Sequence, residues 1–412
     1  MACCADHWFL TDDDPPVPDE TSITSLPVTG TLPAALSGTY LVIGSNPTGA
    51  PDAGEPGRPA AMVHAIAVDA GGTVSYRNRW ITTDAAAPLG REPVPGPRHA
   101  DNDGVATHLF TFGSTILALG DGTLAYELTA DLATHRLVDL GGGGRGLRPR
   151  VELDRYSGAL HLVGVGPGSA QTHVTVAAGA MTRTTCSLDD TPRVDDLAIT
   201  RDHVVFLADG LLGVSPRSVL HERRVEWSTI EGGARRLAGA HDDTRGVVVH
   251  TTGPALERWT LRPRSTTVEH LIVDDLPLTF PNRNPGVPAR GQRYLWTCSA
   301  HGIHRHDLVA DERASHAVGT DHRPAEFRFV TDPARTGSED GGWLVGLIHD
   351  DAHAAADLLF LDAGCFDAGP IATVHIPRRV PNGTHAAWIP ADCTTTLGPP
   401  ARDRLVDVRR SD

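Results

Sequence analysis

Short apolar segments with β-type alternation recur along most of the chain. They are separated by Asp- and Gly-rich turns such as those at residues 69–72, 154–158 and 362–364. Many short strands with regular turns are typical of an all-β sandwich, barrel or propeller. No stretch sustains a 3.6-residue hydrophobic period with caps at both ends, so long amphipathic helices are not expected. The segments that alternate most clearly are residues 39–43, 62–68, 73–80, 116–119, 160–165, 203–207, 246–251, 294–298 and 343–348.

Length and composition fit one large β-rich unit. The chain has 412 residues, of which 40% are hydrophobic, and it carries 43 Gly and 31 Pro. This hydrophobic content can fill a large core, and the turn formers suit many strand connections. No linker divides the pattern, so we expect a single domain over residues 1–412 with its core at about 22–392.

Charge excludes several classes of function. The formal net charge is −15, and an acidic surface repels phosphate backbones, so no nucleic-acid partner is expected. No lysine occurs anywhere, which excludes Schiff-base catalysis.

The cysteines and the chain ends indicate a reduced, cytoplasmic protein. The six cysteines include no CxxC pair, the first residues lack a basic and then apolar signal pattern, and no apolar run is long enough to span a membrane. We expect at most peripheral membrane contact, because the chain is acidic and lacks a basic amphipathic helix. A monomer or homodimer is expected.

Three motifs keep a fixed order along the chain. They are GTLPAALSGTY at residues 30–40, MVH followed by YRNRW within residues 62–80, and RVPNGTHAAW at residues 379–388. This set resembles the carotenoid cleavage oxygenase family from about residue 22 to residue 392. The resemblance implies a seven-bladed β-propeller with an axial site under a loop cap. It also implies four histidines that hold Fe(II), which three carboxylates orient, for the oxidative cleavage of a polyene double bond.

The residues at the positions that resemble the four ligands depart from that pattern. His385 matches the fourth position. Arg150, or Arg148 with a gap, stands at the first, Asp195 at the second, and Leu237 or Arg236 at the third. The positions similar to the three orienting carboxylates hold Asp121, Glu326 and, loosely, Asp357. Guanidinium has no lone pair to offer a metal, so the sequence predicts a site without iron or any other cofactor.

The leading hypothesis is therefore an acid–base enzyme that needs no metal. His385, Asp195, Glu326, Asp121 and Arg150 would form its site, because a carboxyl group buried in an apolar tunnel has a raised pKa and can donate a proton. Isomerisation, cyclisation, elimination or hydration of an apolar polyene, terpenoid or polyketide-like molecule would fit. Two alternatives stay open: an Fe²⁺-dependent dioxygenase that cleaves a carotenoid or stilbene-type bond, and a non-catalytic protein that binds an apolar ligand, with ion pairs filling the axis.

Overall fold

The computed structural model describes most of the chain. The described residues are 17–46, 60–82, 106–112, 115–138, 140, 146–165, 171–176, 183–188, 192–218, 225–262, 268–287, 292–350, 352–381, 383 and 385–392. Within them the regular structure is almost entirely β, with short 3₁₀ turns that include η2 (Ala34–Leu36) and η7 (Phe366–Ala368), and no α-helix.

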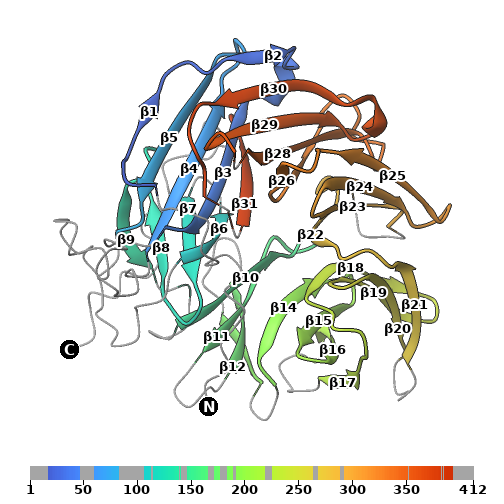
Figure 1. Cartoon of the computed structure of the whole chain (residues 1–412). Helices are drawn as coiled ribbons and strands as arrows, with labels where there is room; N and C mark the ends of the chain where they lie inside the picture. The colour runs from blue at the N-terminus through green and yellow to red at the C-terminus, as the bar shows by residue number, and fades with distance from the viewer. Residues whose placement is uncertain are drawn as a thin grey trace, which may run out of the picture.

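Seven antiparallel sheets follow one another along the chain (Figure 1). The first has the order β1 (Ser22–Ile23), β5 (Val74–Trp80), β4 (Ala61–Val68), β3 (Gly38–Ser45) and β31 (His385–Pro390). The second holds β6 (Ala106–Phe112), β7 (Thr115–Gly120), β8 (Ala125–Leu128) and β9 (Thr134–Val138). The third holds β10 (Gly146–Leu153), β11 (Leu160–Val165), β12 (Gln171–Val176) and β13 (Arg183–Ser187).

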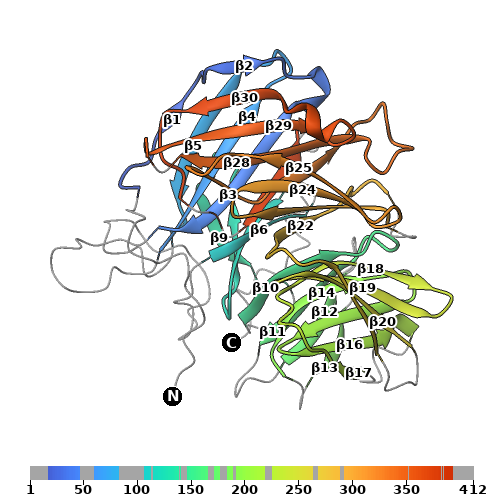
Figure 2. The ribbon, with the colours of Figure 1, turned by 45° about the vertical axis from the view of Figure 1, so that its right-hand side comes forward.

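The remaining four sheets complete the ring (Figure 2). They are β14 (Val194–Ile199), β15 (His203–Ala208), β16 (Leu211–Pro216) and β17 (Glu226–Thr229); then β18 (Arg236–Asp243), β19 (Gly246–Thr252), β20 (Leu256–Leu261) and β21 (Val268–Asp274). The next is β22 (Thr279–Asn282), β23 (Tyr294–Ser299), β24 (Gly302–Asp307) and β25 (Glu312–Ala317). The last has the order β2 (Val28–Gly30), β30 (Pro370–Ile376), β29 (Ala355–Asp362), β28 (Gly342–Asp350) and β26 (His322–Pro324), and β27 (Arg328–Thr331) also pairs with β28.

One strand of each sheet lines the central axis. The inner strands β31, β6, β10, β14, β18 and β22 contact one another in that order, and β27 contacts β31. Asn282 in β22 bridges to the last sheet, where its side chain donates to the Phe327 carbonyl and accepts from the Phe329 amide. The sheets are thus the blades of a closed seven-bladed β-propeller, as the sequence predicts.

Two strands from opposite ends of the chain close the ring. β31 pairs with β3, so that His385 lies opposite Ile43, and the end of the described chain completes the first blade. In return, β2 pairs with β30 and completes the last blade with a segment from the start of the chain. This exchange leaves few open edges where the ring is joined, which stabilises its closure.

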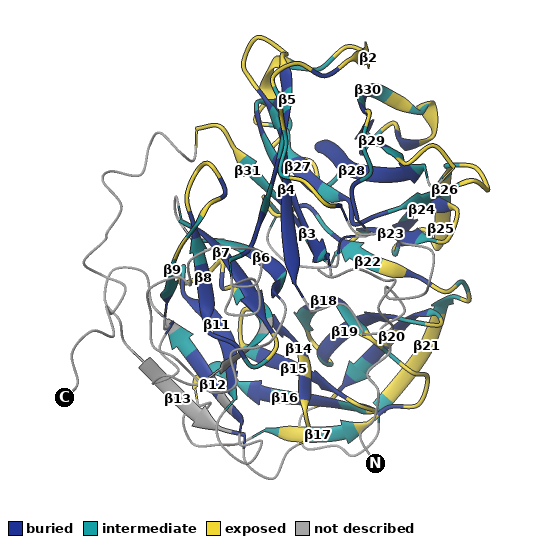
Figure 3. Ribbon diagram, turned by 60° about the vertical axis from the view of Figure 1, so that its left-hand side comes forward, coloured by how far each residue is buried: buried dark blue, intermediate teal, exposed yellow. Residues whose placement is uncertain are grey.

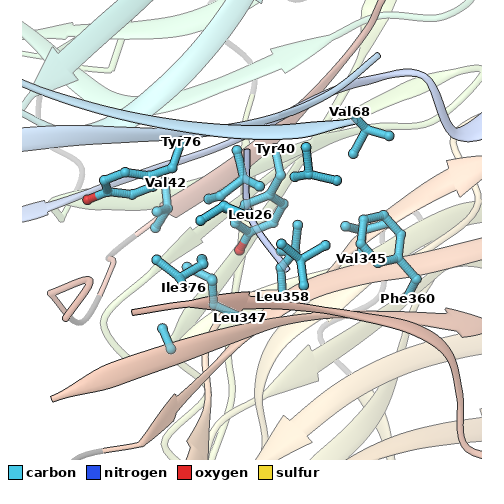
Figure 4. Close-up of a cluster of buried hydrophobic side chains, with 14 of the residues drawn as sticks. Leu26, Tyr40, Val42, Val68, Tyr76, Val345, Leu347, Leu358, Phe360 and Ile376 are labelled. Carbon is cyan, nitrogen blue, oxygen red and sulfur yellow. The ribbon is translucent and has the colours of Figure 1, made fainter. Parts of the chain in front are cut away.

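Apolar side chains fill the spaces between neighbouring blades, and the buried positions follow the blade interiors in Figure 3. Figure 4 shows the cluster between the first and last blades, in which Tyr40 and Tyr76 pack near Leu358 and Ile376. The Tyr40 hydroxyl donates a 2.7 Å hydrogen bond to the Glu326 carbonyl, so this cluster also fixes the backbone beside an axial residue. Blade packing therefore sets the positions of the inner strands.

Five inner strands each carry an irregularity near the axis. The pairing register shifts between Ala106 and His108 in β6, between Leu147 and Val151 in β10, between Val194 and Asp196 in β14, between Leu237 and Gly239 in β18, and between Thr279 and Asn282 in β22. A bulge inserts an extra residue and turns the following side chain to the other face of the strand. Simple alternation therefore does not predict which side chains face the axis.

The described residues include no helix with the length and apolar character needed to cross a membrane. The expected single domain, cytoplasmic location and oligomeric state stay predictions.

Candidate functional site

A cavity of about 870 Å³ lies where the inner strands meet. Side chains from β6, β10, β14, β18, β22, β27 and β31 line it, and Glu326, just before β27, joins them. Segments separated by almost 280 residues, such as β6 and β31, thus contribute to one site. A cavity on the axis of a propeller, lined by both apolar and charged side chains, is the candidate functional site of this molecule.

Two imidazoles stand side by side in the cavity. The rings of His108 and His385 have centroids 4.9 Å apart. The Leu109 amide donates to Nδ1 of His385 at 3.3 Å, so the neutral ring carries its proton on Nε2. Burial lowers the pKa of His385 to about 4 against the opposing Glu326 charge, and burial, Arg150 and His385 hold the pKa of His108 well below its ordinary value. Both rings are therefore neutral at pH 7.

Glu326 ties the last blade to the closing strand. Its Oε2 accepts a 2.7 Å hydrogen bond from the Ala386 amide, and its Oε1 accepts a 3.0 Å bond from Arg328. Burial opposes ionisation, but His385, Arg328, the Ala386 amide and Arg150 together leave the pKa of Glu326 below its ordinary value. Glu326 is thus a charged, fully engaged carboxylate.

Asp196 is a buried carboxyl group whose pKa shifts in the opposite direction to that of Glu326. Its oxygens accept backbone amides from Leu197 at 2.9 Å and Leu237 at 3.0 Å. Burial raises the pKa of Asp196 despite the lowering effects of Arg150 and the two amides. Asp196 can therefore hold a proton closer to neutral pH than Glu326 can.

A second carboxyl group with a raised pKa lies on β10. Burial raises the pKa of Glu152, although the Arg283 guanidinium, 3.2 Å away, and Arg155 oppose the shift. Arg155 in turn donates to the backbone carbonyls of Asn284, Pro285 and Val287. This network ties the loop after β22 to the third blade at the side of the cavity.

Arg150 is a cavity cation without an ion pair in the described part of the chain. Its buried Nε has no hydrogen-bond partner, and within the described part of the chain its guanidinium forms no ion pair. It nevertheless acts electrostatically on His108, Asp196, Glu326 and His385. Arg150 thus contributes to the electrostatic potential at each of these four side chains.

Some of the expected site residues line the cavity and others do not. Arg150, Glu326 and His385 line the cavity, as do the two candidates for the third position, Leu237 and Arg236.

Asp195 and Asp121 do not line this cavity, so the expectation that they share a site with His385 is corrected. Asp195 lies within the irregularity of β14 and pairs with Arg193 at 3.0 Å, whereas the next residue, Asp196, lines the cavity instead. Asp121 forms ion pairs with Arg193 and with Arg148. Arg148, the alternative candidate for the first ligand position, therefore lies outside the cavity lining as an ion-pair partner of Asp121.

Asp357 also lies away from the cavity. It is on β29, where its carboxylate contacts Nδ1 of His375 at 2.9 Å.

Sequence reasoning missed several residues of the cavity: His108, Glu152, Asp196, Arg155, Arg283 and Arg328. Asp196 adjoins the expected Asp195, so the doublet of acids was the available signal. His108 is one residue past a bulge in an ordinary-looking strand, and no local pattern singles it out.

An iron centre of the kind that the resemblance implies needs four converging imidazoles. The described lining supplies His108 and His385, and the described residues contain no group of three or more His, Cys, Asp or Glu side chains that can hold a metal ion. The cavity carboxylates are engaged by amides and arginines, and the permanent charge of Arg150 repels a divalent cation. This donor set does not fit a four-imidazole Fe(II) site.

Fold and site together define a seven-bladed β-propeller with a charged axial cavity. The family profile of the retinal pigment epithelial membrane protein matches residues 15–231 and 228–390. The chain belongs to this family, which includes the carotenoid cleavage oxygenases.

Individual relatives agree with this assignment. A carotenoid cleavage oxygenase of Mycobacterium tuberculosis is 26% identical, over 91% of this chain and 96% of the relative. A variant of the Synechocystis apocarotenoid oxygenase superposes with a TM-score of 0.78 at 19% identity, covering 92% of this chain and 98% of that structure. The lignostilbene dioxygenase of Pseudomonas brassicacearum gives 0.79 at 20% identity, covering 91% of this chain and 97% of that structure. The two structural matches support the propeller fold.

Proposed function

We propose that this protein carries out a metal-independent acid–base transformation of an unsaturated, largely apolar molecule in the axial cavity. The observation that carries the proposal is the burial of Asp196, with a raised pKa, in the same cavity as the neutral His385. A carboxyl group with a raised pKa keeps its proton to a higher pH than an ordinary carboxyl group does, and it can deliver that proton to a conjugated system.

Asp196 can both give and take back a proton. Proton transfer from its carboxyl group to one substrate carbon leaves a cation delocalised over the conjugated chain and an Asp196 carboxylate. The amides of Leu197 and Leu237 already point at that carboxylate and stabilise it. The carboxylate then removes a proton from another carbon, so the molecule is isomerised or cyclised and the enzyme is restored.

His385 has a positioning role in this scheme. With Nδ1 accepting from Leu109, its Nε2–H is a hydrogen-bond donor rather than a base. Such a donor can hold an oxygen substituent of the substrate. Glu326 fixes the start of β31 through the Ala386 amide and thereby fixes the direction of the His385 ring.

The cavity wall suits an extended hydrocarbon. Its apolar members include Leu109, Val151, Leu197, Leu237, Phe280, Phe329 and Trp388. A polyene, a terpenoid or a polyketide-like chain can lie against this wall while a polar group meets the charged side chains. The proposed partner is therefore an apolar small molecule of one of these classes.

We also propose that this protein lacks the iron site that the family resemblance implies. This proposal is supported by the residues at the positions where the resemblance expects imidazoles. Arg150 and Leu237 or Arg236 hold two of these positions on the cavity lining, and Asp195 holds another outside it. Bound iron, where a relative has it, activates O2 for oxidative cleavage; none of the steps proposed above uses it.

Metal analysis and anaerobic turnover test the proposal together. The purified protein is expected to contain well under one iron per chain by plasma mass spectrometry. With a chelator and without O2, it should convert a member of a panel of unsaturated terpenoid and polyketide-like compounds to a product of equal mass, or of a mass changed by one water. Stoichiometric iron with chelator-sensitive, O2-dependent cleavage would overturn the proposal.

The second candidate is an Fe(II)-dependent dioxygenase acting on a carotenoid or stilbene-type bond. It is favoured by the names of the relatives, a carotenoid cleavage oxygenase and a lignostilbene dioxygenase. The same experiment separates the two, and ligand binding without turnover under either condition would identify a non-catalytic binding protein.

A further inference from the structure

The charged groups of the cavity are not balanced. Among the described residues, five arginines line the cavity: Arg150, Arg155, Arg236, Arg283 and Arg328. The described lining also holds four carboxyl groups, those of Glu152, Asp196, Glu326 and Asp392. Burial raises the pKa of two of these acids, Glu152 and Asp196. The cavity therefore favours an anionic guest, although the protein as a whole is strongly acidic.

The cavity arginines differ in how many of their hydrogen-bond donors remain available to a bound anion. Arg328 pairs with Glu326 at 3.0 Å and Arg283 pairs with Glu152 at 3.2 Å. Arg155 is committed to backbone carbonyls. Arg150 forms no ion pair within the described residues, and its Nε is buried without a hydrogen-bond partner. Arg150 is partly exposed and lines the cavity, so its guanidinium is available to a bound anion, which would also give the buried Nε a partner.

A second unpartnered group lies beside Arg150. His108 is only 6% exposed and lines the cavity, and its Nε2 has no hydrogen-bond partner. Its Nδ1 contacts the Thr107 hydroxyl at 2.9 Å. When that hydroxyl donates to Nδ1, the neutral ring carries its proton on Nε2 and offers it as a donor. A guanidinium and an imidazole N–H form a pair of donors suited to a carboxylate.

We propose that the substrate of the axial cavity is an unsaturated carboxylic acid whose carboxylate binds to Arg150 and Nε2 of His108. This inference rests on the proposed function, because it names the group by which that substrate is held. The hydrocarbon chain then lies against the apolar wall formed by residues such as Leu197, Leu237 and Phe329. The arrangement favours an amphiphilic acid over a hydrocarbon without a charged end.

Three polyenes with one carbon skeleton and different end groups provide the probes. Retinoate carries a carboxylate, retinol a hydroxyl and retinal an aldehyde. Their dissociation constants can be measured by quenching of protein tryptophan fluorescence, since Trp388 lines the cavity. We expect retinoate to bind about 10- to 100-fold more tightly than retinol or retinal, as is usual for a hydrogen-bonded charge pair.

Variants locate the source of that preference. Arg150→Gln should weaken retinoate binding by about 10-fold or more and leave retinol binding within about 2-fold, whereas Arg150→Lys should keep part of the preference. His108→Leu should weaken retinoate binding by a smaller factor. Arg262→Gln, which removes an exposed ion pair with Glu269 outside the cavity lining, is the matched control and should bind all three probes as the wild type does.

Circular dichroism and thermal unfolding must first show that each variant folds. Equal affinity of the wild type for retinoate and retinol would overturn the proposal, and so would a retinoate preference that survives Arg150→Gln. Because binding is measured without turnover, this result is independent of the metal and anaerobic assays. An iron-dependent reaction would overturn the proposed function and leave a measured carboxylate preference intact.

Discussion

The Glu326 carboxylate accepts a 2.7 Å hydrogen bond from the backbone amide of Ala386, 60 residues further along the chain. This bond joins the last blade to β31, the strand that closes the first blade and carries His385. Neither residue alone reveals the relationship, since Ala386 contributes only its backbone. Ring closure and the geometry of the cavity thus depend on the same contact.

Removing this carboxylate should cost stability. Glu326→Ala leaves the buried Ala386 amide without an acceptor and is expected to lower the free energy of unfolding by about 1–3 kcal/mol. Glu326→Gln keeps an acceptor oxygen and should cost less. Urea unfolding measures both, with Glu269→Gln as a control at an exposed ion pair, where a change under about 1 kcal/mol is expected. Equal losses in the alanine and glutamine variants would contradict the role of the hydrogen bond.

Asp196 and its neighbour Asp195 provide a matched test of the acid. Asp196→Asn removes the proton donor and should reduce kcat by about 10²- to 10⁴-fold on the substrate found in the anaerobic screen. Asp195→Asn changes a side chain that lies outside the cavity lining and should leave kcat within about 2-fold. Similar losses in the two variants would show that the bulge in β14 does not select Asp196.

The pH dependence of turnover should follow two groups. Below a pH of about 4, His385 becomes protonated and its Nδ1 can no longer accept from Leu109, so activity falls on the acid side. On the alkaline side, activity falls as Asp196 loses its proton, at a higher pH than an ordinary aspartate does because burial raises its pKa. A kcat profile from pH 3.5 to 9 checks this, and an alkaline limb unchanged in Asp196→Asn would assign the proton to another group.

Buried neutral histidines should make the fold sensitive to acid. Burial lowers the pKa of His64, His173 and His250 to about 3. As pH falls below about 6.5, the unfolded chain binds protons that the folded chain cannot, so the free energy of unfolding drops by up to about 1.4 kcal/mol per pH unit and histidine, until the pH reaches about 3. Urea unfolding between pH 7.5 and 4.5 measures this slope, and an unfolding free energy independent of pH would contradict it.

A single added imidazole should not create an iron site. Asp196→His brings a third imidazole to the cavity, but Arg150 keeps its permanent charge there and Leu237 offers no ligand. Metal analysis after expression with added iron is expected to find no stoichiometric iron in Asp196→His, nor in the neighbouring control Asp195→His. Stoichiometric iron in Asp196→His would show that the cavity tolerates a metal despite Arg150.

The alternation of short strands and the three ordered motifs were sufficient to predict the propeller. Most strands of a blade pair with their neighbours in sequence, as β3, β4 and β5 do. The apolar positions and turns that form such strand pairs can therefore be recognised in a short stretch of sequence. His385, Glu326 and Arg150 were also predicted as cavity residues, because each lies in or near a recognisable motif or strand.

Only the tertiary structure decided which neighbouring side chain faces the axis. Asp195 and Asp196 are indistinguishable in sequence, and a bulge set by the pairing of β14 with β15 turns the second one inward. His108 lies in an unremarked strand and becomes a cavity residue because ring closure brings β31 beside β6. Local strand formation depends on nearby residues, whereas bulges and ring closure depend on contacts between blades, so the fold could be predicted from the sequence and the full membership of the site could not.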